Sequence, residues 1–75
     1  MSPVLPRVTA KDITGIIEKK GFVFVRQNGS HRIYKNIEGK RVTVPFHGSV
    51  ILHPKILKSI LKDTDITVES LVGLL

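Results

Sequence analysis

Hydrophobic residues recur with a helical period near the start of the chain. Ile13, Ile16 and Ile17 would lie along one side of a helix running from about Ala10 to Lys20. Gly21 would end this helix, because glycine readily adopts the left-handed conformation that follows many helix C-termini. The pattern therefore predicts an amphipathic first helix.

Thr9 and Asp12 mark the start of that helix. A threonine followed three positions later by an acidic residue is a variant of the capping box, in which each side chain accepts a hydrogen bond from the other residue's backbone N–H. The Asp12 carboxylate also suits the positive end of the helix dipole. We expect residues 1–8 to be an extended lead-in, because they contain two prolines and no periodicity, and residues 9–75 to form a single small domain.

A second helical pattern runs from about Pro54 to Lys62, and proline suits the first position of a helix. Its apolar stripe consists of Ile56, Leu57, Ile60 and Leu61. Its basic stripe consists of Lys55, Lys58 and Lys62. The lysines either contact a polyanion or form an ordinary solvated face. After a break at Asp63–Ile66, Thr67 can cap a last helix over Val68–Leu74, whose predicted core residues are Val68, Leu71, Val72 and Leu75.

Between these helices, runs of alternating residues predict three strands, at Phe22–Gln27, His31–Ile37 and Lys40–Val44. Turns are expected at Asn28-Gly29 and Glu38-Gly39. In the second strand, one face would carry His31, Ile33, Lys35 and Ile37, and the other Arg32, Tyr34 and Asn36. In the first strand, one face would carry Phe22, Phe24 and Arg26, and the other Val23, Val25 and Gln27.

The order of elements predicts an α+β fold, an α-β-β-β-α sandwich with a three-stranded antiparallel sheet and a short C-terminal helix. Double-stranded RNA-binding domains have the same order. We expect Phe22, Phe24 and Phe46 in the core, whereas Tyr34 either fills a sheet surface or stacks on a base. Pro45 should end the third strand, and a loop should follow from Phe46 to Leu52.

The charge of the chain is unevenly distributed. Residues 1–62 carry all twelve basic residues but only three of the six acidic ones, a net charge of +9, whereas residues 63–75 carry −3. This favours a polyanionic partner such as RNA, because neutralising phosphates releases counterions, although a basic surface can also serve solubility alone. The chain has no cysteine, which excludes disulfides and thiol chemistry. Without an apolar run of membrane-spanning length or a signal-like N-terminus, a cytoplasmic protein is expected.

The candidate chemistry centres on His31, which follows the predicted hairpin turn together with Ser30 and Arg32. An imidazole can take or give a proton near neutral pH, as RNA cleavage by the 2′-hydroxyl requires, although a histidine near a turn is often only a surface residue. His47 could supply a second proton-transfer group or simply bind backbone in its loop, and His53 is most simply a residue flanking the second helix. The three histidines lack the spacing of metal ligands, so no metal or other cofactor is expected.

Four segments carry a family resemblance: Gly21-Phe22; Arg26-Gln27-x-Gly29-Ser30-His31-x-x-Tyr34; Val42-Thr43-Val44-Pro45-x-His47; and Leu57-x-x-Ile60-Leu61. From about Leu5 onward, the chain resembles the HicA family of bacterial and archaeal mRNA-cleaving toxins. The resemblance implies a fold like that of a double-stranded RNA-binding domain and a catalytic role for His31, with Gly29 and Ser30 completing its motif. It also implies a HicB antitoxin that occludes the active site.

Arg32 departs from the family pattern, because many relatives have a second histidine at that position. It could bind phosphate instead, yet strand alternation predicts that it points away from the face that carries His31. Lys35, or a lysine among Lys55, Lys58 and Lys62, is then the better phosphate partner. The expected function is a metal-independent endoribonuclease toxin, and the alternative is a non-catalytic RNA-binding or protein-interaction module with the same fold.

Overall fold

The computed structural model describes residues 5–47 and 49–75, so residues 1–4 of the predicted lead-in and Gly48 of the predicted loop lie outside the described residues. The elements follow in the order α1 (Ala10–Lys19), β1 (Val23–Asn28), β2 (His31–Lys35), β3 (Arg41–Pro45), α2 (Pro54–Thr64) and α3 (Val68–Leu74). The three strands form one antiparallel sheet in the order β1-β2-β3. The predicted α+β fold is confirmed.

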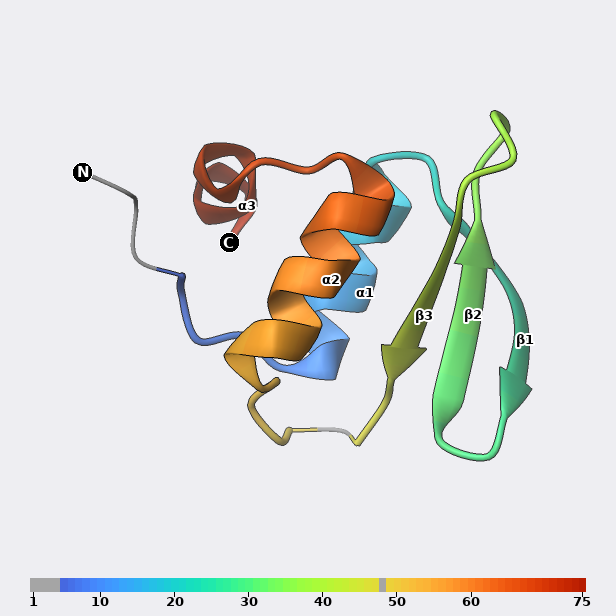
Figure 1. Ribbon diagram of the computed structural model, residues 1–75, viewed down its shortest axis with the longest axis horizontal. Coiled ribbons are helices and arrows are strands. Elements are labelled where there is room, and N and C mark those ends of the chain that lie inside the picture. The colour runs from blue at the N-terminus through green and yellow to red at the C-terminus, as the bar shows by residue number, and fades with distance from the viewer. Residues whose placement is uncertain (1–4, 48) are drawn as a thin grey trace.

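Helices α1 and α2 lie on the same side of the sheet, next to β3, while α3 lies on the far side of these helices from the sheet (Figure 1). One end of the molecule, the lower end in Figure 1, gathers the β1–β2 turn, the loop after β3 and the first turns of α1 and α2. The opposite end carries the β2–β3 turn and the end of α2. The two ends therefore differ in the loops that they present.

The predicted start and end of α1 are confirmed. Asp12 N–H donates to Thr9 Oγ1 and Thr9 N–H donates to Asp12 Oδ2, each at 3.1 Å. After the C-cap residue Lys20, Gly21 has a φ of +95°. Phe22 N–H donates to the Ile17 carbonyl at 3.0 Å, a pattern typical of a Schellman motif. Local sequence therefore defines this helix at both ends.

Strand β1 contains a bulge that changes which of its residues share a face. Phe24 pairs with Tyr34, but the register then shifts so that Arg26 pairs with Ile33 and Gln27 with Arg32. Paired residues of an antiparallel ladder lie on the same face of the sheet. The predicted alternation of β1 is therefore wrong beyond Val25: Arg26 lies on the face opposite Phe24, and Gln27 shares the face of Phe24.

The turn between β2 and β3 begins earlier than predicted. Strand β2 ends at Lys35, because the Asn36 side chain accepts a hydrogen bond from Lys40 N–H at 2.8 Å and closes a turn over residues 36–40. Ile37 lies in this turn and is fully exposed, so its predicted place on the strand is wrong. Gly39 has a φ of +85°, as a glycine in a tight turn allows.

Helix α2 extends past Lys62 to Thr64, so the predicted break at Asp63 is wrong. The Thr64 hydroxyl donates to the Ile60 carbonyl at 2.8 Å and is buried, which lets a polar residue continue the helix. Asp65 ends the helix in the left-handed conformation, with a φ of 57°, and pairs with Lys40 of the β2–β3 turn. This ion pair joins the sheet to α2 at the end opposite the β1–β2 turn.

The core contains residues from α1, α2 and α3, from β2 and β3, and from the segments before and between the elements. It consists of Val8, Ala10, Ile13, Ile16, Ile17, Phe22, Tyr34, Val42, Val44, Leu52, Leu57, Ile60, Leu61, Ile66 and Leu71. Val8 was not expected there, but Leu52 N–H donates to its carbonyl at 2.8 Å and holds the end of the lead-in against the loop before α2.

Some residues predicted to be in the core are exposed instead. Phe24 is 47% exposed because β1 is the edge strand farthest from the helices (Figure 1). Ile56 of α2 and Val72 and Leu75 at the C-terminus are also exposed, and Leu74, rather than Leu75, packs against the core. Phe46 is half-buried against the core.

Within the described residues, no helix is long and apolar enough to span a membrane.

Candidate functional site

The turn before His31 is a two-residue loop formed by Gly29 and Ser30 between the paired residues Asn28 and His31. The turn therefore lies one residue later than predicted, and Asn28 belongs to β1. Gly29 has a φ of +61° whereas Asn28 and Ser30 do not have positive φ, as in a type II′ hairpin turn. Gln27 Nε2 donates to the Gly29 carbonyl at 2.9 Å and holds the turn from one side.

His31 is the first residue of the central strand. It pairs with Asn28 of β1 and Pro45 of β3, and its side chain is exposed. The buried residues Tyr34, Val42 and Val44 face the helices, so His31 lies on the other face of the sheet. We call this the open face, and its members are Val23, Arg26, Asn28, His31, Ile33, Lys35, Arg41, Thr43 and Pro45.

The open face is basic. Arg26, Lys35 and Arg41 are exposed, and none of the strand residues on this face is acidic. Arg26 pairs with Ile33, two residues from His31 on the same face, so it is the nearest of these cations along the ladder. Sequence reasoning missed Arg26 because strict alternation placed it with Phe24, and only the bulge brings it beside His31.

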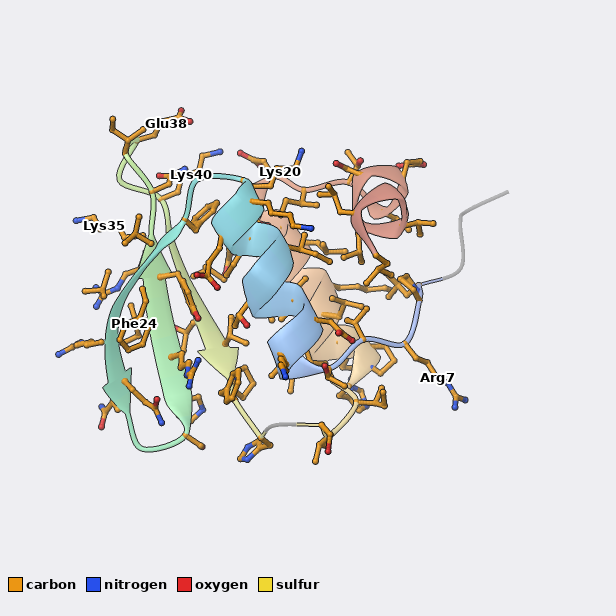
Figure 2. All side chains as sticks on the ribbon, turned by 180° about the vertical axis from the view of Figure 1, so that it is seen from behind. Arg7, Lys20, Phe24, Lys35, Glu38 and Lys40 are labelled. Carbon is orange, nitrogen blue, oxygen red and sulfur yellow. The ribbon has the colours of Figure 1, made fainter. Side chains whose placement is uncertain are left out.

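The other predicted phosphate partners are spread along the molecule. Lys35 shares the face of His31 but lies at the other end of β2, about 13 Å away at roughly 3.3 Å per residue. Figure 2 shows it pointing outward, toward the end of the sheet that carries the β2–β3 turn. Lys55 lies in the first turn of α2, at the same end of the molecule as His31. Lys58 and Lys62 border an open groove with Leu5 and residues 65–68, away from the sheet.

The loop that carries His47 begins beside the hairpin turn. Phe46 N–H donates to the Ser30 carbonyl at 2.6 Å, which extends the β2–β3 ladder one step beyond Pro45. His47 follows directly and is exposed, so it emerges at the same end of the molecule as His31. His53 caps α2 through Nδ1, which accepts from Lys55 N–H at 3.1 Å, and its predicted helix-flanking place is confirmed.

Arg32 lies on the opposite face from His31, as strand alternation predicts. Its Cζ atom lies 3.7 Å from the centroid of the Phe46 ring, and its Nε donates to Gln27 Oε1 at 3.2 Å. Arg32 as a whole is half-buried, on the side of the sheet that the helices occupy. Its contacts in this structure are therefore with protein groups that surround the turn.

Tyr34 fills the sheet surface under the helices. It is 2% exposed and meets the edge of Phe24 with ring centroids 5.8 Å apart and an interplanar angle of 71°. This burial confirms the prediction that Tyr34 fills a sheet surface, and it excludes base stacking by the Tyr34 ring in this conformation. Among residues 5–47 and 49–75, no three His, Asp or Glu side chains come close enough together to hold a metal ion.

A family model described as the HicA toxin of bacterial toxin–antitoxin systems matches residues 10–66, about three quarters of the chain. The chain belongs to the HicA toxin family. The HicA match runs from the start of α1 to just beyond α2 and includes the Gly29-Ser30-His31 turn, whereas α3 lies outside it. A search of curated proteins finds no match to the chain.

Proposed function

We propose that this HicA-family chain is an endoribonuclease that cleaves messenger RNA and that His31 is its proton-transfer residue. The observation that carries the proposal is the position of the Gly29-Ser30-His31 motif within the family match, with the imidazole exposed on a basic face of the sheet. An exposed histidine beside fixed cations is suited to a polyanionic substrate that is too large for an enclosed pocket.

The reaction uses the RNA's own 2′-hydroxyl as the nucleophile, without a metal ion. His31 removes the 2′-proton while the 2′-oxygen attacks the adjacent phosphorus, and the bond to the 5′-oxygen then breaks with transfer of a proton to that oxygen. The products are a 2′,3′-cyclic phosphate and a free 5′-hydroxyl. General acid–base help of this kind contributes about 10²- to 10⁴-fold in rate. His47 is the candidate for the second proton because its loop is joined to the turn through Phe46 and Ser30.

Cations around His31 hold the substrate and stabilise the crowded anionic phosphorane. Arg26 is the nearest of these along the sheet, and Lys35 and Arg41 extend the same face toward its far end. Lys55 adds a cation from the start of α2. Lys58 and Lys62 would reach only an RNA that also passes along α2, because they border a groove away from the sheet. Ser30 directly precedes His31 in the chain and is half-buried. It can orient the imidazole or a phosphate oxygen.

Membership of a toxin–antitoxin family implies an antitoxin partner. We propose a HicB-type protein that covers the open face and thereby blocks access to His31. Such a partner would present acidic groups, because Arg26, Lys35 and Arg41 provide positive charge without a neighbouring acid on that face.

His31→Gln tests the catalytic role with little change in shape. We expect purified wild-type protein to cut messenger RNA and to arrest growth on expression, and we expect co-expression of the antitoxin to restore growth. The His31→Gln variant should lose at least about 100-fold in cleavage rate but keep its thermal stability and RNA affinity. Undiminished cutting by a folded His31→Gln protein would overturn the role of His31.

The same measurements identify the alternative function. An RNA-binding module would bind RNA tightly and with strong salt dependence, leave the RNA intact and be unaffected by His31→Gln. Cleavage products that carry cyclic phosphate ends, formed in the presence of a chelator, would contradict that alternative and support the proposed reaction.

A further inference from the structure

Both chain neighbours of His31 contact Phe46, the first residue after β3. The Ser30 carbonyl accepts a hydrogen bond from Phe46 N–H at 2.6 Å. On the other side of His31, the Arg32 guanidinium stacks over the Phe46 ring, with 3.7 Å between Cζ and the ring centroid. Phe46 is thus joined to the backbone before His31 and to the side chain after it.

Arg32 also connects Phe46 to the hairpin turn through Gln27. Arg32 Nε donates to Gln27 Oε1 at 3.2 Å, and Gln27 Nε2 donates to the Gly29 carbonyl at 2.9 Å. These contacts link the turn, through the side chains of Gln27 and Arg32, to the ring of Phe46 at the start of the next loop. We call Gln27, Arg32 and Phe46 the turn clamp.

The position of His31 explains why such a clamp matters. His31 begins β2 directly after the two-residue turn, so it lies at the end of the β2–β3 ladder, next to the loop that follows β3. The rung between Ser30 and Phe46 is the next one beyond His31 on the β3 side. The turn clamp supports that rung from the face of the sheet opposite His31. The side chain of His31 therefore stays exposed to solvent.

We propose that Arg32 is a positioning residue that acts through Phe46 and Gln27 to fix His31 and the loop carrying His47 in their relative places. This inference rests on the proposed function of His31. Arg32 does not need to touch RNA to affect cleavage, because a displacement of about 1 Å in a reacting group can cost up to about 100-fold in rate.

A direct phosphate contact is the competing role for Arg32, and substitutions separate the two. Lysine keeps the charge but loses the planar group that stacks on Phe46 and the Nε–H that reaches Gln27. Phe46→Leu keeps an apolar side chain but removes the aromatic ring that the guanidinium faces. A phosphate contact would tolerate Phe46→Leu, whereas a clamp depends on both partners.

Cleavage kinetics and the salt dependence of RNA binding are to be measured on Arg32→Lys, Arg32→Ala, Phe46→Leu and the double variant Arg32→Lys/Phe46→Leu, with Arg7→Lys as the matched control. Arg7 is exposed and points away from the rest of the molecule in Figure 2. We expect each clamp variant to lower kcat by about tenfold or more without changing KM, and the double variant to be no slower than the slower single variant. The salt dependence of RNA binding should remain that of the wild type.

Two kinetic results would overturn the clamp. One is a wild-type kcat in folded Arg32→Lys and Phe46→Leu. The other is a rise in KM for Arg32→Ala together with a salt slope that falls by about one, which would indicate a lost phosphate contact.

If the wild-type protein does not cut RNA, the proposed function fails. The turn clamp can still be tested then, by a measurement that needs no RNA. Amide hydrogen exchange at Phe46 reports whether the rung to Ser30 is held closed. We expect exchange at least about tenfold faster in Arg32→Lys than in the wild type or Arg7→Lys. Unchanged exchange in Arg32→Lys would contradict the clamp whether or not the protein is an enzyme.

Discussion

At the scale of single residues, backbone conformation at Gly29 decides where His31 is placed. Its φ of +61° lies in the left-handed region, which costs residues with a Cβ atom free energy. Apart from atoms of Gly29 and its two chain neighbours, no heavy atom lies within 4 Å of a Cβ placed at this position, so the cost of a larger residue comes from the backbone conformation rather than from a clash with another part of the chain. The turn therefore depends on glycine for its conformational freedom.

Gly29→Ala should accordingly lower the free energy of unfolding by about 1–2 kcal/mol. Gly15→Ala is the matched control, because Gly15 lies in the interior of α1, is exposed and also has free space around a built Cβ. That change should raise the free energy of unfolding by about 0.5–1 kcal/mol, since alanine favours helix. Urea unfolding of both variants checks the pair, and equal effects at the two sites would contradict the account of the turn.

At the scale of secondary-structure elements, the bulge in β1 determines the chemistry of the open face. It moves Arg26 to the face of His31 and Gln27 to the face of Arg32. The first change adds a cation beside the candidate catalytic residue, and the second brings Gln27 within hydrogen-bonding distance of Arg32. A single irregular residue in an edge strand thus contributes to both the open face and the turn clamp.

Arg26→Gln should weaken RNA binding and reduce the slope of log affinity against log salt concentration by about one, because each phosphate contact releases counterions. Arg7→Gln, which removes the same charge on the exposed lead-in, serves as the control for net charge. Binding titrations at several salt concentrations measure both variants. An equal change in slope for Arg7→Gln would show that total charge, rather than the open face, determines affinity.

At the scale of the whole molecule, α3 belongs to the same core as the family-matched region although it lies beyond residue 66. Leu71 is fully buried, and the half-buried Val68 and Leu74 pack against the same cluster. Val72, on the same helix, is 52% exposed. The terminal helix therefore covers part of the core through a narrow set of contacts.

Leu71→Ala should lower the free energy of unfolding by about 2–5 kcal/mol, because it leaves a cavity among buried side chains. Val72→Ala removes apolar atoms from the same helix at an exposed position and should change stability by no more than about 0.5 kcal/mol. Chemical denaturation of the two variants is the measurement. Similar stabilities would mean that α3 is not anchored to the core through Leu71.

The sequence by itself determined the order of the elements and the starts of the three helices and of β2. Thr9 with Asp12, Gly21 and Thr67 act through hydrogen bonds and dihedral angles that span only a few residues, so their effects can be predicted locally. The strand alternation that separates His31 from Arg32 is likewise a local property of β2. The motif around His31, together with three further segments, also indicated the family.

Tertiary structure decided which of these residues act together. The bulge that places Arg26 beside His31 depends on pairing between β1 and β2, and the exposure of Phe24 depends on how far the helices reach across the sheet. The contact between Arg32 and Phe46 joins a residue of β2 to a residue of the loop after β3, and their separation in sequence predicts nothing about their distance. Register and packing are collective properties of the folded chain, which is why they could not be obtained from local patterns alone.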